Sequence, residues 1–302
     1  MVKQRKMKIR QSKLTISVHI LSYLFIALFA IACLLPFWLI ITASLSTETV
    51  INQTGIGLLP KRFTLDAFKY VFRSPKDLLG SYGVTIIMTV SGTALGLFII
   101  SMAGYVLQRK DFPFRNQISF FIYFTTLFSA GLAPTYLWIT QYLNLKDSYF
   151  AVFLQLLMSP WLIVLMKNFA KSVPFEITES GKIDGAGDFR IFLSLVLPML
   201  KPALATIGLF LALGYWNEWY QSMLYLTSKV AYKPLQYYLY AIVNQAAAMK
   251  SSMAGNNVST GALPTQTIKM ATALVATGPI ILLYPFVQKY FISGITVGAV
   301  KG

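Results

Sequence analysis

Long apolar segments alternate with shorter polar ones along most of this chain. A bilayer hydrocarbon core of about 30 Å requires roughly 20 mostly apolar residues per helix. Six segments meet this requirement. They lie at about residues 17–43, 82–107, 117–139, 149–168, 202–226 and 267–288. The third is interrupted by Ser129, Gly131 and Pro134, and the fifth contains Asn217 and Glu218, so five spans is the alternative count. The pattern predicts an all-α integral membrane protein with six transmembrane helices.

Composition supports lipid as the solvent of this protein. Of its 302 residues, 56% are hydrophobic and only 12% are charged, whereas soluble domains carry about 25% charged residues. The net charge of +16 would suit nucleic acid, but the basic residues flank apolar runs and form no compact basic domain. A single cysteine excludes an internal disulfide, and no Cys/His cluster has metal-binding spacing. We therefore expect one transmembrane domain, residues 1–302, with no metal site and no nucleic-acid partner.

The distribution of Lys and Arg predicts the orientation, since these residues are enriched in cytoplasmic loops. With the N-terminus in the cytoplasm, 16 of the 26 basic residues fall on that side and 10 fall on the longer outer loops. Both termini and the polar segment at residues 169–201 are then cytoplasmic. The basic start and Ala30-Ile31-Ala32 before Cys33 also resemble a cleaved signal peptide. Because Cys33 is followed by more apolar sequence, we expect an uncleaved first helix.

Two outer excursions are predicted. The first, at residues 44–81, is expected to contain a short amphipathic helix at the membrane surface. The second, at about 227–266, includes a polar stretch near Met249–Gly261 that we expect to be mobile.

The segment at residues 169–201 has the pattern of a helix-turn-helix. Pro174 ends the preceding helix because it biases its predecessor away from helical geometry. Glu176 and Glu179 lie early in a new helix, where carboxylates favour the positive end. Gly185 follows Asp184 in a turn, and an apolar helix restarts after it. The product is a body with acids at one end and an apolar ridge at the other, suited to fit a cleft on a partner. The alternative is an ordinary polar loop.

The spacing within this segment resembles a known family motif. Glu179, Gly185 six positions later and Leu195-x-Leu197-Pro198 match the E-A-A-x3-G-x9-I-x-L-P loop of binding-protein-dependent ABC importer permeases. Trp216-Asn217-Glu218-Trp219 and the ending Gly298-Ala299-Val300-Lys301-Gly302 resemble the carbohydrate-importing kind, of the maltose-type smaller permease subunit. The motif's two alanines are replaced by Ser180 and Gly181, and glycine loosens a helix by about 1 kcal/mol relative to alanine.

The resemblance implies a type I permease fold in a bacterial inner (cytoplasmic) membrane, and a function in saccharide or oligosaccharide import. It implies three partners: an ABC ATPase dimer, a second, non-identical permease and an extracellular solute-binding protein. The chain itself is not expected to be an enzyme, because the P-loop G-x-x-x-x-G-K-[ST] is absent and Gly181-Lys182 is followed by Ile183. ATP and Mg are therefore expected on the partner, with no cofactor bound by this chain. The residues expected to couple to the ATPase are Glu176, Glu179, Ser180, Gly181, Asp184, Gly185, Ala186, Phe189, Leu193, Leu197 and Pro198.

Polar groups within membrane spans are candidates for a substrate path. These candidates are Trp216, Asn217, Glu218, Trp219 and Tyr220, and secondarily Tyr123, Thr126 and Gln155. Aromatic faces suit sugar CH groups, whereas carboxylates and amides suit hydroxyls. The alternatives are an interfacial aromatic belt and, for Thr126, helix–helix hydrogen bonding.

Other functions remain open from the residues alone. They are an ABC importer for a non-sugar solute and a proton-coupled carrier. The second is disfavoured because Glu218 is the single acid within a predicted span, and a membrane enzyme is disfavoured because His19 is the only histidine.

Overall fold

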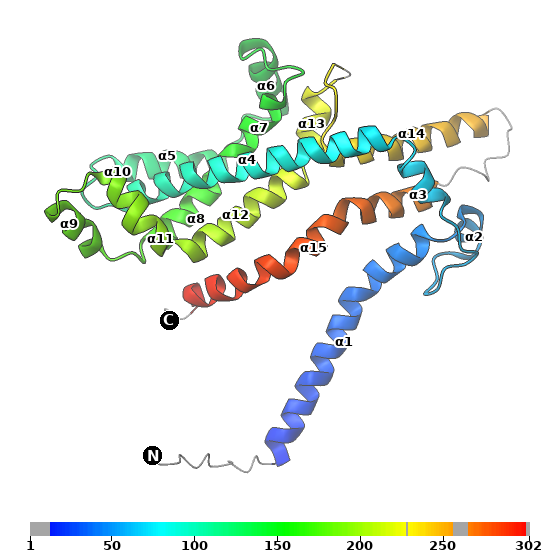
Figure 1. Cartoon of the computed structure of the whole chain (residues 1–302), viewed down its shortest axis with the longest axis horizontal. Helices are drawn as coiled ribbons and strands as arrows, with labels where there is room; N and C mark the ends of the chain where they lie inside the picture. Colours follow the sequence, from blue (N-terminus) through cyan, green and yellow to red (C-terminus); the bar gives the residue numbers. More distant parts are fainter. Residues whose placement is uncertain (1–12, 228, 256–264, 300–302) are drawn as a thin grey trace. The chain divides into compact units, whose positions relative to one another are not determined.

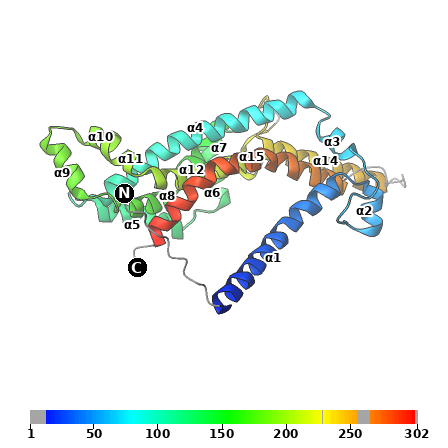
Figure 2. The same cartoon turned by 60° about the horizontal axis from the view of Figure 1, so that its bottom comes forward.

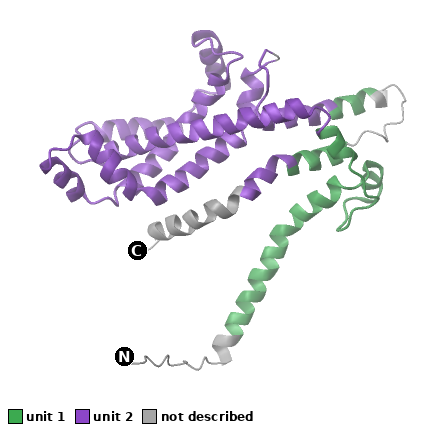
Figure 3. Cartoon of the chain, viewed as in Figure 1, with its two compact units in different colours: residues 1–71, 246–274 green, residues 72–245, 275–302 purple. Residues whose placement is uncertain are grey.

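The computed structural model describes residues 13–227, 229–255 and 265–299, and its named elements in this part of the chain are all helices (Figures 1 and 2). An isolated bridge between Ser46 and Phe63 is the one β-type pairing outside them. The helices fall into two compact units (Figure 3). Unit 1 comprises Met1–Val71 and Ala246–Leu274, and unit 2 comprises Phe72–Gln245 and Val275–Gly302.

Unit 1 contains α1 (Lys13–Ser44), α2 (Glu48–Thr54), α3 (Asp66–Val71) and parts of two longer helices, α14 (Leu235–Gly255) and α15 (Thr265–Ala299). The most apolar window of α1 has no buried residue. Its far end is held by the loop after α2. There Trp38 Nε1 donates to Leu58 O at 2.8 Å, and Thr42 Oγ1 donates to Gly57 O at 2.8 Å.

A buried carboxylate fixes the start of α15 within unit 1. Glu48, 6% exposed, accepts hydrogen bonds from the backbone N–H groups of Gln266 and Thr267, each at 2.9 Å, and from the hydroxyls of Thr265 and Thr267. The first N–H groups of a helix have no partner within the helix, so Glu48 satisfies them from a distant part of the chain. Lys250 Nζ lies 3.7 Å from the same carboxylate.

Unit 2 is built on α4 (Pro75–Gln108), which packs along α8 (Pro160–Ala170) and α12 (Lys201–Trp216). Glycines allow the close approach. A Cβ at Gly104 would lie 2.6 Å from Met166 of α8, and one at Gly92 would lie 2.2 Å from the Tyr215 ring of α12. Small residues at helix contacts are typical of membrane helix packing. The resulting core includes Ile100, fully buried between these helices.

The remaining helices of unit 2 are short and separated by bends. They are α5 (Arg115–Leu127), α6 (Leu132–Leu137), a π-helix (Trp138–Tyr142), α7 (Tyr149–Leu157), α9 (Phe175–Ile183), α10 (Asp188–Ile191), a second π-helix (Phe192–Val196), α11 (Leu197–Met199) and α13 (Tyr220–Tyr225). Figures 1 and 2 place α9 and α10 at one end of this unit.

Three helical segments of the described chain are long and apolar enough to cross a membrane: Ser17–Ser44, Pro75–Gln108 and Tyr149–Ala170. Two further candidates are bent pairs. Arg115–Leu127 with Leu132–Tyr142 turns by 112°, and Asp188–Met199 with Lys201–Trp216 turns by 86°. The structure thus supports three spans, or up to five if each bent pair is one span, and the six-span arrangement and the single domain stay predictions.

The two segments predicted as outer excursions are more helical than expected. The first contains α2 and α3. In the second, α14 continues to Gly255 through part of the stretch that was expected to be mobile, and the rest of that stretch lies outside the described residues.

Candidate functional site

The predicted helix-turn-helix is present as α9 followed by α10, a π-helix and α11, and is called the 175–199 segment. Pro174 precedes α9 with an extended ψ of 138°, as expected for a proline that separates two helices. Glu176 lies in the first turn of α9 and Lys182 in the last, both favourable for the helix dipole. Gly185 then reverses the chain with a φ of 76°, which glycine adopts without steric cost.

One face of the 175–199 segment packs onto α4. Thr178 is buried, and its Oγ1 shares a hydrogen bond with Tyr105 Oη at 3.3 Å. The Tyr105 ring stacks on Phe192, with centroids 5.7 Å apart. Gly181 of α9 faces Ile191 of α10, and a Cβ at position 181 would lie 2.9 Å from Ile191 Cγ1. Glycine at position 181, where the motif has alanine, therefore lets α9 and α10 pack closely.

An ion-pair network fastens the same segment to the turn after α4. Arg109, 8% exposed, forms two hydrogen bonds to the Asp111 carboxylate and a third, at 2.7 Å, from Nη1 to Asp188 Oδ1. Lys182 Nζ lies 3.2 Å from Asp111 and 3.8 Å from Asp188. These four residues line a cavity of about 370 Å³ together with Val106 and Phe112. Two cations and two carboxylates thus join α4, α9 and α10.

The electrostatics of the network favour the charged forms of Arg109 and Asp111. The hydrogen bonds from Arg109 hold the pKa of Asp111 far below its usual 3.8, against the smaller opposing effect of burial. The Asp111 carboxylate in turn raises the pKa of Arg109 further. The Arg109–Asp111 pair is therefore insensitive to pH in the neutral range.

The other face of the 175–199 segment is exposed. Among the residues predicted to couple to an ATPase, Gly181 is buried and Ala186 and Leu197 are half-buried. The remaining ones are exposed: Glu176, Glu179, Ser180, Asp184, Gly185, Phe189, Leu193 and Pro198. Ile183, which was not among the predicted site residues, is 86% exposed, the highest value among the large hydrophobic residues that the structure describes. Phe189 is 57% exposed and also touches Phe98, with ring centroids 6.4 Å apart.

The predicted substrate-path residues do not form one cluster. Trp216 is buried and donates from Nε1 to Ala276 O at 3.1 Å. Glu218 accepts hydrogen bonds from the backbone of Gln221 and Ser222 and thereby caps α13. Trp219 and Tyr220 are partly exposed, and Trp219 lies 4.6 Å from Tyr240 between ring centroids.

The other members of that set bond within their own helices or to nearby elements. Asn217 accepts from Gln236 at 3.4 Å. Gln155 donates to Ala151 O, and Thr126 donates to Tyr123 O. Tyr123 is 53% exposed on α5, a helix that packs against α8 and α4, whereas α13 packs against α7. The structure thus separates Tyr123 and Thr126 from the Trp216–Tyr220 group.

Sequence reasoning missed Arg109, Asp111 and Lys182 as site residues. The charged turn Arg109-Lys110-Asp111 directly after a span was a readable signal, but its pairing with residues more than 70 positions away was not. Ile183 was readable as an apolar residue directly before a polar turn. Among the described residues, no group of three or more His, Cys, Asp or Glu side chains could hold a metal ion.

Comparison with known proteins identifies the family. No family model matches the chain. The chain is 41% identical over 284 residues to "Polygalacturonan/rhamnogalacturonan transport system permease protein YtcP" of Bacillus subtilis (strain 168), covering 93% of this chain and 97% of the relative. It is 31% identical to "Maltodextrin transport system permease protein MdxG" of the same organism, covering 94% and 96%.

A solved structure agrees with these relatives. It is the crystal structure of a bacterial ABC transporter involved in the import of the acidic polysaccharide alginate, with a TM-score of 0.74 and 28% identity, covering 93% of this chain and 99% of that one. The resemblance noted from the sequence motifs is thereby confirmed. This chain belongs to the family of permease subunits of carbohydrate ABC transport systems, which are multi-pass membrane proteins.

Proposed function

We propose that this chain is one of two non-identical permease subunits of an ATP-driven importer in the cytoplasmic membrane. An extracellular solute-binding protein delivers an oligosaccharide, and a separate ATPase dimer hydrolyses ATP with Mg. Both termini and the 175–199 segment face the cytoplasm, in keeping with the Lys and Arg distribution. The 41% identity to a polygalacturonan/rhamnogalacturonan permease supports an oligosaccharide that contains uronic acid as the cargo.

The two-sided 175–199 segment is the observation that carries this proposal. One side is joined to α4 by the Arg109–Asp188 hydrogen bond and by the hydrogen bond between Tyr105 and Thr178. The exposed surface presents Glu179, Ile183 and part of the Phe189 ring, which also contacts Phe98 of α4. An acid beside two large apolar groups suits a partner groove that combines a basic residue with an apolar floor.

The packing of α4 supports a route for motion. When ATP closes the ATPase dimer, a segment docked in it moves with the nucleotide domains. Because α4 packs along both α8 and α12, a displacement at its cytoplasmic end moves the bundle as one body. Such rocking of permease halves alternates access to a site near the midplane.

For the sugar path, the neighbouring exposed rings of Trp219 and Tyr220 are favoured among the predicted residues. The capping hydrogen bonds of Glu218 favour a positioning role for it at the start of α13. A structure with bound saccharide that lacks contacts to Trp219 and Tyr220 would contradict the aromatic path.

The experiment is uptake by the purified complex in proteoliposomes with the ATPase and solute-binding protein present. We expect uptake of labelled oligogalacturonate to require ATP and to persist with a protonophore; uptake that needs a proton gradient but no ATP would overturn the proposal. Labelled maltotriose tests the cargo class, and we expect little uptake of it.

Charge reversal tests the coupling surface. Glu179→Lys should abolish ATP-dependent uptake, while membrane insertion and assembly with the second permease continue. Asp66→Lys makes the same charge change at an exposed site on α3 and serves as the control. Normal uptake by the Glu179→Lys complex would remove Glu179 from the coupling surface.

A further inference from the structure

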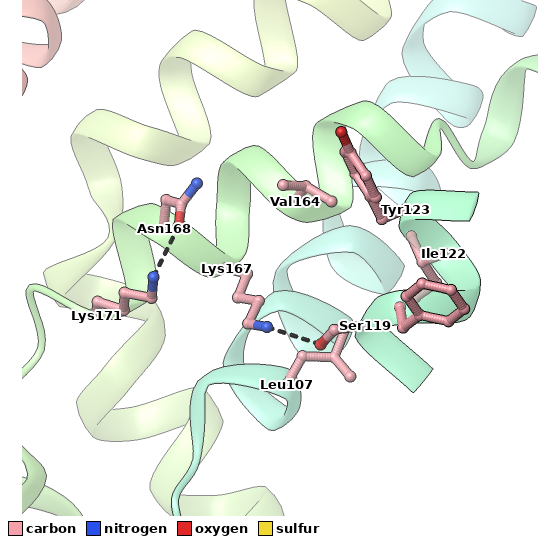
Figure 4. Close-up of a pocket in the computed structure, with 9 residues that line it drawn as sticks. Leu107, Ser119, Ile122, Tyr123, Val164, Lys167, Asn168 and Lys171 are labelled. Carbon is pink, nitrogen blue, oxygen red and sulfur yellow. Dashed lines mark hydrogen bonds between the residues drawn. The ribbon is translucent and has the colours of Figure 1, made fainter. Parts of the chain in front are cut away.

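A second cavity, of about 240 Å³, lies between the end of α4, the start of α5 and the end of α8 (Figure 4). Its polar lining is basic and neutral: Lys167, Lys171, Asn168 and Ser119. Lys167 Nζ donates to Ser119 Oγ at 2.7 Å, and Lys171 Nζ donates to Asn168 Oδ1 at 3.1 Å. None of the residues that line this cavity belongs to the 175–199 segment.

The two lysines have unused capacity to bind an anion. None of the residues that line the cavity is acidic, and within the described part of the chain neither lysine forms a salt bridge with a carboxylate. Each ammonium group carries three donors, and one polar contact is recorded for each. The charges of Arg115 and Lys171 both act on Lys167. The cavity therefore concentrates positive charge that nothing in the described structure balances.

Its position is that of a membrane surface. Lys167 lies in the last turn of α8, where the candidate span Tyr149–Ala170 ends, and Ser119 lies in the first turn and a half of α5. The 175–199 segment begins a few residues after Lys171, at the same membrane face. Long basic side chains at helix ends normally reach the polar headgroup layer.

The remaining wall is apolar and open. Phe120 is 68% exposed and Tyr123 is 53% exposed. Both lie on α5, which has no buried residue. A ligand whose anionic end meets the lysines would lay an apolar body against these rings. A saccharide would need hydrogen-bonding partners for its hydroxyls along this wall, and the aromatic side chains supply few.

We propose that this cavity binds the headgroup of an anionic phospholipid, with the phosphate between Lys167 and Lys171 and an acyl chain along Phe120 and Tyr123. Basic pockets between transmembrane helices are suited to such headgroups. The bound lipid connects the start of α5 to the end of α8 and neutralises their facing cations. The inference depends on the family assignment but not on the identity of the cargo.

The test uses the purified transporter complex in nanodiscs of phosphatidylcholine that contain a trace of photoactivatable phosphatidylglycerol. We expect crosslinks on peptides that contain Phe120 or Tyr123, competed by unlabelled phosphatidylglycerol but not by phosphatidylcholine. Lys167→Gln with Lys171→Gln should reduce this crosslinking about tenfold, since each basic residue adds to the attraction for an anionic lipid. Lys110→Gln with Lys201→Gln removes two exposed charges outside the cavity and should change it little.

Two more variants protect the test against misfolding. Lys167→Arg with Lys171→Arg keeps both charges and should retain crosslinking. Ser119→Asp keeps both lysines but adds a carboxylate beside Lys167, and should lower crosslinking in a complex that still assembles. Equal labelling by photoactivatable phosphatidylcholine would overturn the proposal. So would competition by millimolar glycerol phosphate, which indicates a site for a free phosphate, or by oligogalacturonate, which indicates a saccharide site.

Discussion

Arg109 Nη1 donates a hydrogen bond to Asp188 Oδ1 at 2.7 Å and thereby joins the end of α4 to the start of α10. The two residues are 79 positions apart in the sequence. Arg109 is almost fully buried whereas the Asp188 side chain is 61% exposed, so the two partners differ in what their removal leaves behind.

Replacement of Arg109 should therefore be more harmful than replacement of Asp188. Arg109→Gln leaves Asp111 without its bidentate partner and should lower the free energy of unfolding by about 2 kcal/mol. Asp188→Asn should cost less than about 1 kcal/mol, because solvent screens this exposed carboxylate. Thermal unfolding of both single variants and the double variant measures the coupling; effects that simply add would show that the pair is not energetically linked.

Gly181 should tolerate only the smallest side chain. Gly181→Ala gains about 1 kcal/mol of helix propensity, offset by the contact of its Cβ with Ile191, so assembly with the ATPase should change little. Gly181→Val should push α9 away from α10. It should reduce both assembly with the ATPase and uptake several-fold. Gly187→Val is the matched control, because a Cβ at Gly187 meets nothing within 4 Å. Equal tolerance of valine at both positions would contradict the tight contact.

Ile183 should contribute to the ATPase interface through its apolar surface. Burial of such a side chain contributes about 2 kcal/mol, so Ile183→Asp should weaken ATPase binding roughly thirtyfold. Co-purification and a titration of the ATPase against the permease complex measure this loss. Leu59→Asp, at a residue 74% exposed in unit 1, makes the same chemical change away from the 175–199 segment. Similar losses for both variants would mean that Ile183 has no particular role.

The hydrogen bonds to Glu48 predict that the free energy of unfolding decreases in acid. Burial would raise its pKa, but the hydrogen bonds from Gln266, Thr267 and Thr265 together outweigh burial and hold the pKa below 4.5. A lowered folded-state pKa stabilises the fold above the unfolded value, and this contribution disappears as pH falls through the folded pKa. Glu48→Gln should thus cost roughly 2 kcal/mol at neutral pH, with the difference from wild type shrinking below pH 4.5.

Thermal unfolding of wild type and Glu48→Gln between pH 7 and pH 3.5 checks this dependence. Glu179→Gln, at an exposed carboxylate, should follow wild type throughout. A difference between wild type and Glu48→Gln that stays constant with pH would exclude ionisation of Glu48 as its source.

Hydropathy predicted where apolar helices lie better than where they end. The segment at 149–168 was predicted as one helix, but α7 ends at Leu157 and α8 begins at Pro160. Pro160 is a signal for a helix boundary, but the apolar residues on both sides of the break led to the prediction of one continuous helix. The segment at 202–226 breaks after Trp216. Hydropathy cannot distinguish an acid on a transport path from a helix cap, and Glu218 bonds as a cap.

The turn chemistry of the 175–199 segment was predictable because it is local. Pro174 and Gly185 have the expected roles. The ion pairs and the Gly181 contact depend on which elements pack together in the fold. A single sequence does not show which elements do so. Helix α14 was missed for a different reason: its Ala, Gln and Met residues favour helix, but the polar composition of the surrounding loop dominated the prediction.

The absence of buried residues in the apolar window of α1 has a consequence for how substitutions act. The large apolar side chains between Val18 and Leu35 are exposed, and Phe25 stacks on Phe29 of the same helix. Acyl chains or another polypeptide can cover such a surface without any change within α1. Replacements along it are therefore expected to act on the affinity of α1 for whatever covers it more than on packing within unit 1.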